Sequence, residues 1–195
     1  MPYSELLKLN LGLGLGDTRN FNPQIEVARL DGATKYWVFD VPVVVPLGGS
    51  VEIDLLYDPN TTIDNDYILC SEASTSTSSF FLSREAIGVG SSGIISEYTI
   101  DEQASNNFPY DNSFHTIKYI FDNDLGRVKF LGTRFNIQQL SRGIFKNFRV
   151  RDGVGSIVNE ILLTNKSQGA TQLATVGSIN ATMINYTGDE WERLP

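Results

Sequence analysis

The sequence is poor in the residues that form disulfides, zinc sites and many catalytic centres. It has one cysteine, Cys70, and one histidine, His115, in 195 residues. A single cysteine cannot form an internal disulfide, and it excludes zinc sites that need two to four cysteines. His115 could act as a general base, but no G-x-S-x-G nucleophile motif accompanies it. Its position just before an alternating apolar segment favours a partly buried, hydrogen-bonded side chain.

Positive charge and long apolar runs are also scarce. The chain has 15 Lys and Arg against 23 Asp and Glu, a net charge of −8. Overall electrostatics therefore do not attract this chain to nucleic acids or anionic membranes. The longest apolar run, 41–47, is interrupted by Pro42 and Pro46, and the N-terminus has no basic start before an apolar stretch. We expect no nucleic-acid partner, no membrane insertion and no signal peptide.

Short segments with apolar residues at every second position recur along the chain. Val51, Ile53 and Leu55, for example, alternate with Glu52 and Asp54. This period is typical of half-buried strands, and clusters of Gly, Asn, Asp and Ser separate the segments. Strands are predicted at 36–41, 51–57, 67–70, 80–83, 94–100, 116–121, 127–131, 148–151, 156–163 and 182–186. About ten short strands without intervening helices indicate an antiparallel sandwich or barrel.

Two expectations concern how these segments are connected. The strands at 116–121 and 127–131 flank a turn-like D-N-D-L-G stretch, which predicts a hairpin. Residues 1–30 are predicted to be an N-terminal arm and 31–195 a single domain. The leucines of the arm must be covered, either by the domain's own sheet or by a partner or second copy. We expect truncation ahead of Asp31 to leave a folded domain and remove assembly.

Basic residues are concentrated in one part of the chain. Residues 127–151 contain seven Lys and Arg and no acidic residue. This stretch is either an anion-binding strip or a balance for acidic strands, and surface charge patterns favour the second. Glu52 and Asp54 share one strand face, as the carboxylates of some glycosidases do. Without an aromatic residue or a third acid beside them, they are better interpreted as charge partners of the basic stretch.

One turn-rich stretch could bind calcium. Residues 58–66 place five Asp and Asn side chains close together, and calcium prefers six to eight oxygen ligands in flexible loops. The spacing does not match an EF-hand, and Asp and Asn are also favoured in ordinary turns. The candidate calcium ligands are Asp58, Asn60, Asp64 and Asp66. No other cofactor is expected.

Several motifs occur in a recognisable order. They are L-D-G-A-T-K-Y-W at 30–37, H-T-I-K-Y-I at 115–120, V-K-F-L-G-T at 128–133, G-I-F-K-N-F-R-V at 143–150, and I-N-A-T-M-I-N-Y at 179–186 followed by Trp191. Together they resemble the laminin-G/concanavalin A-like domains of tailed-phage and prophage structural proteins, over about residues 31–195. The 131–133 stretch departs from the family because it lacks an acidic residue or Asn before Gly132. The resemblance implies an all-β, antiparallel two-sheet jelly-roll sandwich with a binding or structural role.

The resemblance gives two expectations for function. The first is a non-catalytic virion or tail-associated module that recognises host cell-surface carbohydrate, made in the host cytoplasm and located in the virion. Its candidate ligand-binding residues lie on a long polar loop, where aromatic rings would be exposed: Asn107, Phe108, Tyr110 and Asp111. The alternative is a structural or decoration protein that assembles with other virion proteins or as a homo-oligomer through residues 1–30. A glycan-degrading enzyme is less favoured, because a second convincing acid is missing.

Overall fold

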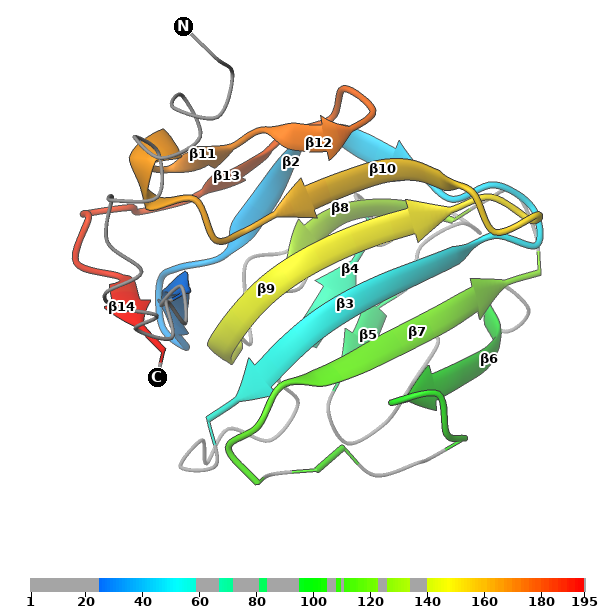
Figure 1. The fold of residues 1–195 in the computed structure, drawn as a ribbon, viewed down its shortest axis with the longest axis horizontal. Coiled ribbons are helices and arrows are strands. Elements are labelled where there is room, and N and C mark those ends of the chain that lie inside the picture. Colours follow the sequence, from blue (N-terminus) through cyan, green and yellow to red (C-terminus); the bar gives the residue numbers. More distant parts are fainter. Residues whose placement is uncertain are drawn as a thin grey trace, which may run out of the picture.

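The chain folds into two antiparallel β-sheets that lie face to face, as a computed structural model shows (Figure 1). The structure describes residues 25–58, 67–71, 81–83, 95–104, 108–109, 111–122, 126–133 and 140–194. Within these residues the one helical element is the short 3₁₀ turn η1 (Lys166–Gln168). The prediction of an all-β, two-sheet sandwich is therefore confirmed.

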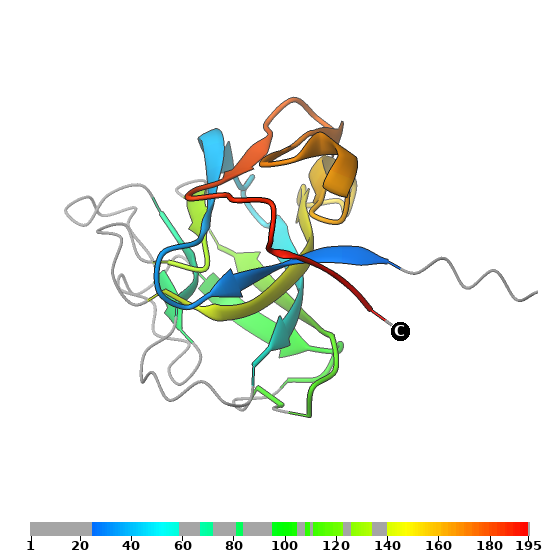
Figure 2. The same cartoon turned by 90° about the vertical axis from the view of Figure 1, so that its left-hand side faces the viewer.

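The larger sheet has eight strands, and six of them form its continuous path. In spatial order these are β12 (Ala174–Val176), β10 (Ile157–Leu162), β9 (Arg142–Arg151), β3 (Ser50–Tyr57), β7 (His115–Phe121) and β6 (Ile95–Ile100). The other two strands are β1 (Glu26–Asp31) and β14 (Trp191–Arg193). β1 pairs with the start of β9 through one half and with β14 through the other, and Figure 2 shows β1 and β14 side by side.

The smaller sheet covers the inner face of the larger one. Its strands, in spatial order, are β11 (Thr171–Gln172), β13 (Ala181–Met183), β2 (Trp37–Val44), β8 (Arg127–Leu131), β4 (Tyr67–Cys70) and β5 (Phe81–Ser83). Phe39 of β2 and Phe148 of β9 meet between the sheets with ring centroids 4.5 Å apart. Each fully buried side chain of this size contributes about 1.5–3 kcal/mol, so the interior between the sheets is the main source of stability.

The alternation in the sequence determines which side chains fill this interior. On β7 every second residue, from His115 through Ile117 and Tyr119 to Phe121, is buried, while the residues between them are half-buried. On β3 Val51, Ile53 and Leu55 are fully buried. Adjacent residues of a strand point to opposite faces. The residues between these positions therefore lie on the outer face of the larger sheet.

The predicted hairpin between residues 116–121 and 127–131 is wrong. β7 pairs with β3 and β6 in the larger sheet, whereas β8 pairs with β2 and β4 in the smaller sheet. The backbone at the two strand ends pairs elsewhere: Gly48 N–H donates to Phe121 O at 2.9 Å, and Val45 N–H donates to Gly126 O at 2.8 Å. Alternation shows that a strand has one buried face, but not which sheet the strand joins.

The expected boundary between arm and domain at residue 30 is also too late. β1 begins at Glu26, and its Val27, Ala28 and Leu30 are fully buried. Truncation ahead of Asp31 would therefore remove a strand of the sandwich. Residues 1–24, which contain the leucines of the predicted arm, lie outside the described residues.

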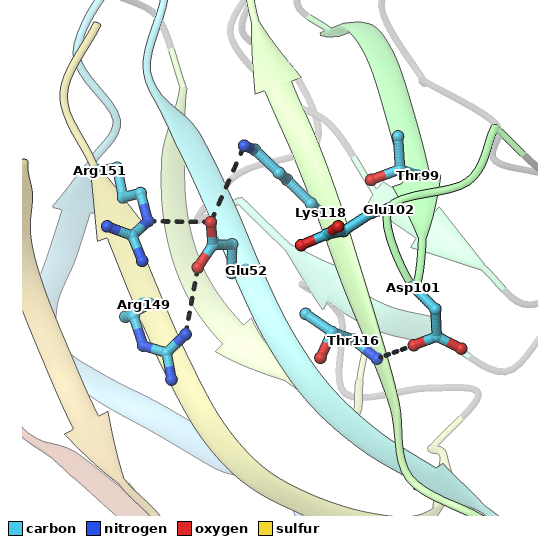
Figure 3. A pocket seen from close by; sticks show the side chains of 8 residues that line it. All are labelled: Glu52, Thr99, Asp101, Glu102, Thr116, Lys118, Arg149 and Arg151. Carbon is cyan, nitrogen blue, oxygen red and sulfur yellow. Dashed lines mark hydrogen bonds and ion pairs between the residues drawn. The ribbon is translucent and has the colours of Figure 1, made fainter. Parts of the chain in front are cut away.

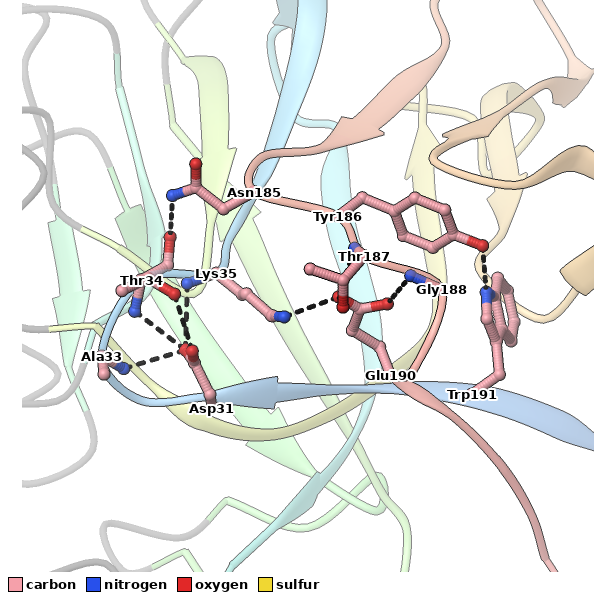
Figure 4. A network of polar contacts seen from close by, with 10 residues as sticks. All are labelled: Asp31, Ala33, Thr34, Lys35, Asn185, Tyr186, Thr187, Gly188, Glu190 and Trp191. Carbon is pink, nitrogen blue, oxygen red and sulfur yellow. Dashed lines mark hydrogen bonds and ion pairs between the residues drawn. The ribbon is translucent and has the colours of Figure 1, made fainter.

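A polar network joins the turn after β1 to the C-terminal segment (Figure 4). The Asp31 carboxylate accepts backbone N–H bonds from residues 33–35, each 2.9 Å long. Glu190 accepts from Lys35 Nζ at 2.6 Å and from the backbone N–H groups of Thr187 and Gly188 at 2.8 and 2.7 Å. Burial alone would raise the pKa of Glu190, but these donors outweigh it and lower the pKa to about 2.

Leu30 provides a test of whether β1 belongs to the core. We expect Leu30→Ala to lower the free energy of unfolding by about 2–5 kcal/mol, because it opens a cavity between the sheets. Ile25→Ala is the matched control, since Ile25 is 39% exposed just ahead of the same strand, and it should cost less than about 1 kcal/mol. Urea denaturation measures both, and equal losses would contradict this placement of β1.

Glu190 makes stability depend on acid pH. Because its folded pKa lies below the unfolded value, its contribution is present above about pH 4.3 and is lost as the pH falls towards 2. Between pH 5 and 2, wild type should lose on the order of 2–3 kcal/mol more stability than Glu190→Gln. Asp189→Asn, which leaves this network intact, is the control and should follow wild type. Parallel pH curves for wild type and Glu190→Gln would refute the assignment.

Candidate functional site

A polar groove of about 490 Å³ lies on the outer face of the larger sheet (Figure 3). It crosses β9, β3, β7 and β6 and includes the turn that follows β6. The side chains that line it are all charged or hydroxyl-bearing: Glu52, Thr99, Asp101, Glu102, Thr116, Lys118, Arg149 and Arg151. Six of them occupy polar positions of alternating strands, and Asp101 and Glu102 belong to the turn, so the pattern that builds the core also builds most of the groove. We call this surface the sheet groove.

Strand register places opposite charges next to one another across the floor of the sheet groove. Glu52 of β3 lies opposite Arg149 of β9 on one side and opposite Lys118 of β7 on the other. The row continues outwards, because Glu160 of β10 lies opposite Arg149 and Thr99 of β6 lies opposite Lys118. Opposite charges on directly paired residues stabilise a sheet, typically by a few tenths of a kcal/mol to about 1 kcal/mol each.

Glu52 is the centre of this row. Its carboxylate accepts from Arg151 Nε at 2.9 Å and from Arg149 Nη1 at 3.2 Å, and its side chain is only 12% exposed. Burial alone would raise the pKa of Glu52, but the hydrogen bonds and charges of the two arginines lower it below its usual value. The Glu52 carboxyl is therefore held ionised, with both oxygens engaged.

The turn after β6 forms a wall of the sheet groove, at the end away from Arg149 and Arg151. Asp101 and Glu102 both have left-handed backbone angles, with φ of 50° and 65°. Asp101 Oδ1 accepts the N–H of Thr116 at 2.9 Å, and Asp101 Oδ2 contacts Nδ1 of His115 at 2.5 Å. Left-handed conformations are uncommon for residues other than glycine and persist where surrounding contacts hold them.

His115 confirms the structural interpretation made from the sequence. The residue is 9% exposed, and both ring nitrogens have carboxylate partners, Asp101 and Asp111. Three arginines of the basic stretch likewise take part in internal charge balance. Arg142 Nε lies 3.0 Å from Asp58, and Arg149 and Arg151 bond Glu52.

The predicted ligand loop is only partly described, and one expectation for it is wrong. Phe108 is 6% exposed, and its ring contacts those of Tyr57 and His115 in the core. It therefore offers no exposed aromatic face to a ligand. Asp111 is exposed and accepts a hydrogen bond from His115 at 2.9 Å when the imidazole donates. Asn107 and Tyr110 lie outside the described residues.

Of the predicted calcium ligands, the structure describes only Asp58. It is 8% exposed and forms ion pairs with Arg142 at 3.0 Å and Arg29 at 3.9 Å, so calcium would have to displace arginine contacts. Asn60, Asp64 and Asp66 lie outside the described residues. In the described ranges no group of three or more His, Cys, Asp or Glu side chains could hold a metal ion. Calcium binding stays a prediction.

The sequence did not reveal the sheet groove as a site, although it revealed its parts. Alternation identified Glu52, and the cluster 127–151 identified Arg149 and Arg151. Asp101 and Glu102 gave no signal, since they are two acids in a polar stretch. The pairing of Glu52 with Lys118 would follow from the sequence only if the register of β3 against β7 were known.

Comparisons with known proteins found no match to this chain. No family model matches the chain, and neither the curated proteins nor the solved structures contain a match. Among the helices of the described residues, none has the length and apolar character to span a membrane.

Glu52→Gln tests the charge row. The amide leaves Arg149 and Arg151 without their shared negative charge, and we expect a loss of about 1–3 kcal/mol in the free energy of unfolding, between the values for exposed and for buried pairs. Glu97→Gln is the matched control, because Glu97 is an exposed carboxylate on β6 outside the groove lining. Chemical denaturation at low and high salt measures both, and the same small change in both variants would argue against the row.

Proposed function

We propose that this chain is a non-catalytic carbohydrate-binding module whose ligand occupies the sheet groove. The supporting observation is a groove lined by three cationic and three carboxylate side chains, several of which ion pairs and hydrogen bonds hold in place. The resemblance of the sequence to concanavalin A-like phage domains extends the proposal to a jelly-roll topology and to a place in a tail or virion.

Carbohydrate fits this lining because each sugar hydroxyl both donates and accepts hydrogen bonds. Guanidinium and carboxylate groups offer pairs of donors or acceptors in one plane, and hydrogen bonds to charged groups contribute about 1.5–3 kcal/mol each. The equal number of positive and negative side chains in the lining favours a hydroxyl-rich ligand over a polyanion. A volume of about 490 Å³ is also within the usual range of small-molecule sites.

The ionised state of Glu52 and Asp101 favours binding over sugar hydrolysis. A glycosidase needs one carboxyl group with a raised pKa to protonate the leaving oxygen. Glu52 and Asp101 instead have lowered pKa values, Asp101 because bonds from His115 and the Thr116 N–H outweigh the raising effect of burial. Both therefore serve as fixed acceptors.

A glycan array of bacterial surface polysaccharides, probed with and without calcium, tests the proposal. Wild type should bind a defined glycan, and Lys118→Met should weaken the measured affinity about tenfold by removing one charged donor. Lys166→Met is the matched control, because the two lysines have side-chain exposures of 40% and 49% and ion pairs of 3.9 and 3.7 Å.

Lys166→Met should bind as wild type does. If no glycan binds and light scattering shows a stable oligomer, the proposal fails and the structural virion role replaces it. If both lysine variants lose affinity equally, the ligand does not occupy the sheet groove. Loss of binding on calcium removal would instead direct attention to residues 58–66.

A further inference from the structure

His115 lies where the core of the sandwich meets the sheet groove. It is the first residue of β7 and shares the inner face of that strand with Ile117 and Tyr119. Its ring contacts Phe108, with centroids 5.5 Å apart. The next residue, Thr116, points to the opposite face and lines the sheet groove. A change in the protonation of His115 therefore occurs one residue away from the sheet groove.

Both nitrogens of the imidazole face carboxylates. Nδ1 lies 2.5 Å from Asp101 Oδ2, and Nε2 lies 2.9 Å from Asp111 Oδ1. A protonated imidazole donates from both nitrogens, whereas a neutral imidazole donates from one and accepts at the other. Loss of the proton would therefore leave a lone pair against one of the carboxylates and break one of the two contacts.

Asp101 transmits this contact to the sheet groove. Its second oxygen, Oδ1, accepts the Thr116 N–H at 2.9 Å, and its own N–H donates to Thr116 O at 2.9 Å. Asp101 and Glu102, with their left-handed backbone, form one wall of the groove. Such a backbone conformation is unfavourable for residues other than glycine, so it depends on contacts of this kind.

We propose that His115 is a positioning residue for the sheet groove: its protonated imidazole joins Asp101 to Asp111 and thereby holds the wall formed by Asp101 and Glu102. When His115 loses its proton, this wall loosens and the groove binds its ligand less tightly. The inference deepens the proposed function and rests on it only for the effect on ligand affinity. The contacts that join Asp101, His115 and Asp111, which we call the clamp, are present in the free protein.

The charges around His115 determine the direction of the pH effect. Burial lowers the pKa of His115, but Asp101 and Asp111 outweigh this and raise it above 6.5. The clamp is therefore complete below about pH 6.5 and is lost as the pH rises through the raised pKa. Asp101 and Asp111 have lowered pKa values and stay ionised down to about pH 4.

Other titratable groups near this clamp lie on three elements. They are Asp54 of β3, which accepts from Thr116 Oγ1, Tyr57 of β3, whose ring contacts Phe108, Glu102 in the turn after β6, and Lys146 of β9, which lies over the ring of Phe114. Of the groups named around the clamp, the imidazole is the one of a chemical type that ordinarily titrates between pH 6 and 8. The histidine's own signal therefore has to report the transition.

The sequence makes the test direct, since the chain contains a single histidine. In a ¹H–¹³C spectrum of the full chain the imidazole Cε1–H signal is unique, and its titration should have a midpoint above pH 6.5. The amide signals of Glu102 and Thr99 should shift with the same midpoint, while those of Val154 and Ser167, far along the chain, should not. Asp111→Asn should lower the midpoint towards 6.5, and the control Glu97→Gln should leave it unchanged.

This titration needs no ligand. A midpoint at or below pH 6.5, or amide signals of Glu102 and Thr99 that do not shift with the His115 midpoint, would refute the proposed role of His115. The second measurement is the affinity for the glycan selected on the array, at pH 5.5 and pH 8.5. We expect binding to be roughly two- to tenfold tighter at pH 5.5, the effect of about one hydrogen bond, and pH-independent in His115→Asn. Binding without this pH dependence would refute the inference and leave the proposed function standing. Absence of any glycan binding would refute the proposed function alone.

Discussion

The alternation of side chains along β3 governs both faces of the larger sheet. Val51, Ile53 and Leu55 must fill the space between the sheets, so Glu52 and Asp54 must project from the outer face. A shift of one residue in the pairing of β3 would bury the carboxylates and expose the apolar side chains. The core and the charge row across the sheet groove therefore stabilise the same register.

The charge row gives the outer face of the larger sheet hydrogen-bond donors and acceptors in fixed positions. Glu52 lies among three cations of β9 and β7, and Arg149 also bonds Glu160 of β10 at 2.8 Å. Glu52, Arg149 and Arg151 are each held by a charged neighbour, so their rotamers are already restricted, which would lower the entropy cost of binding the proposed ligand. At the other wall His115 holds Asp101 in a similar way, through a group whose charge changes near neutral pH.

Most strands could be predicted from the sequence, because a period of two over four or more residues is a local signal. β11, β12 and β14 contain only two or three residues each, too few to show a period. The sequence predicts an arm where β1 lies, because a Leu-rich segment precedes it. Phe108 is buried, although an exposed ring is expected there. Most residues around it in the sequence are polar, so no local pattern indicates that its side chain reaches the core.

From the sequence alone one can infer which side chains of the longer strands face the core, where many of the turns lie and how charge is distributed along the chain. These properties depend on neighbours a few residues apart. The three-dimensional packing is what places β7 and β8 in different sheets and brings Arg149 and Arg151 to Glu52 across 97 and 99 residues of sequence. It also decided that Asp101 and Asp111 meet at His115. Such pairings depend on which strands bury their apolar faces together, and no local period contains that information.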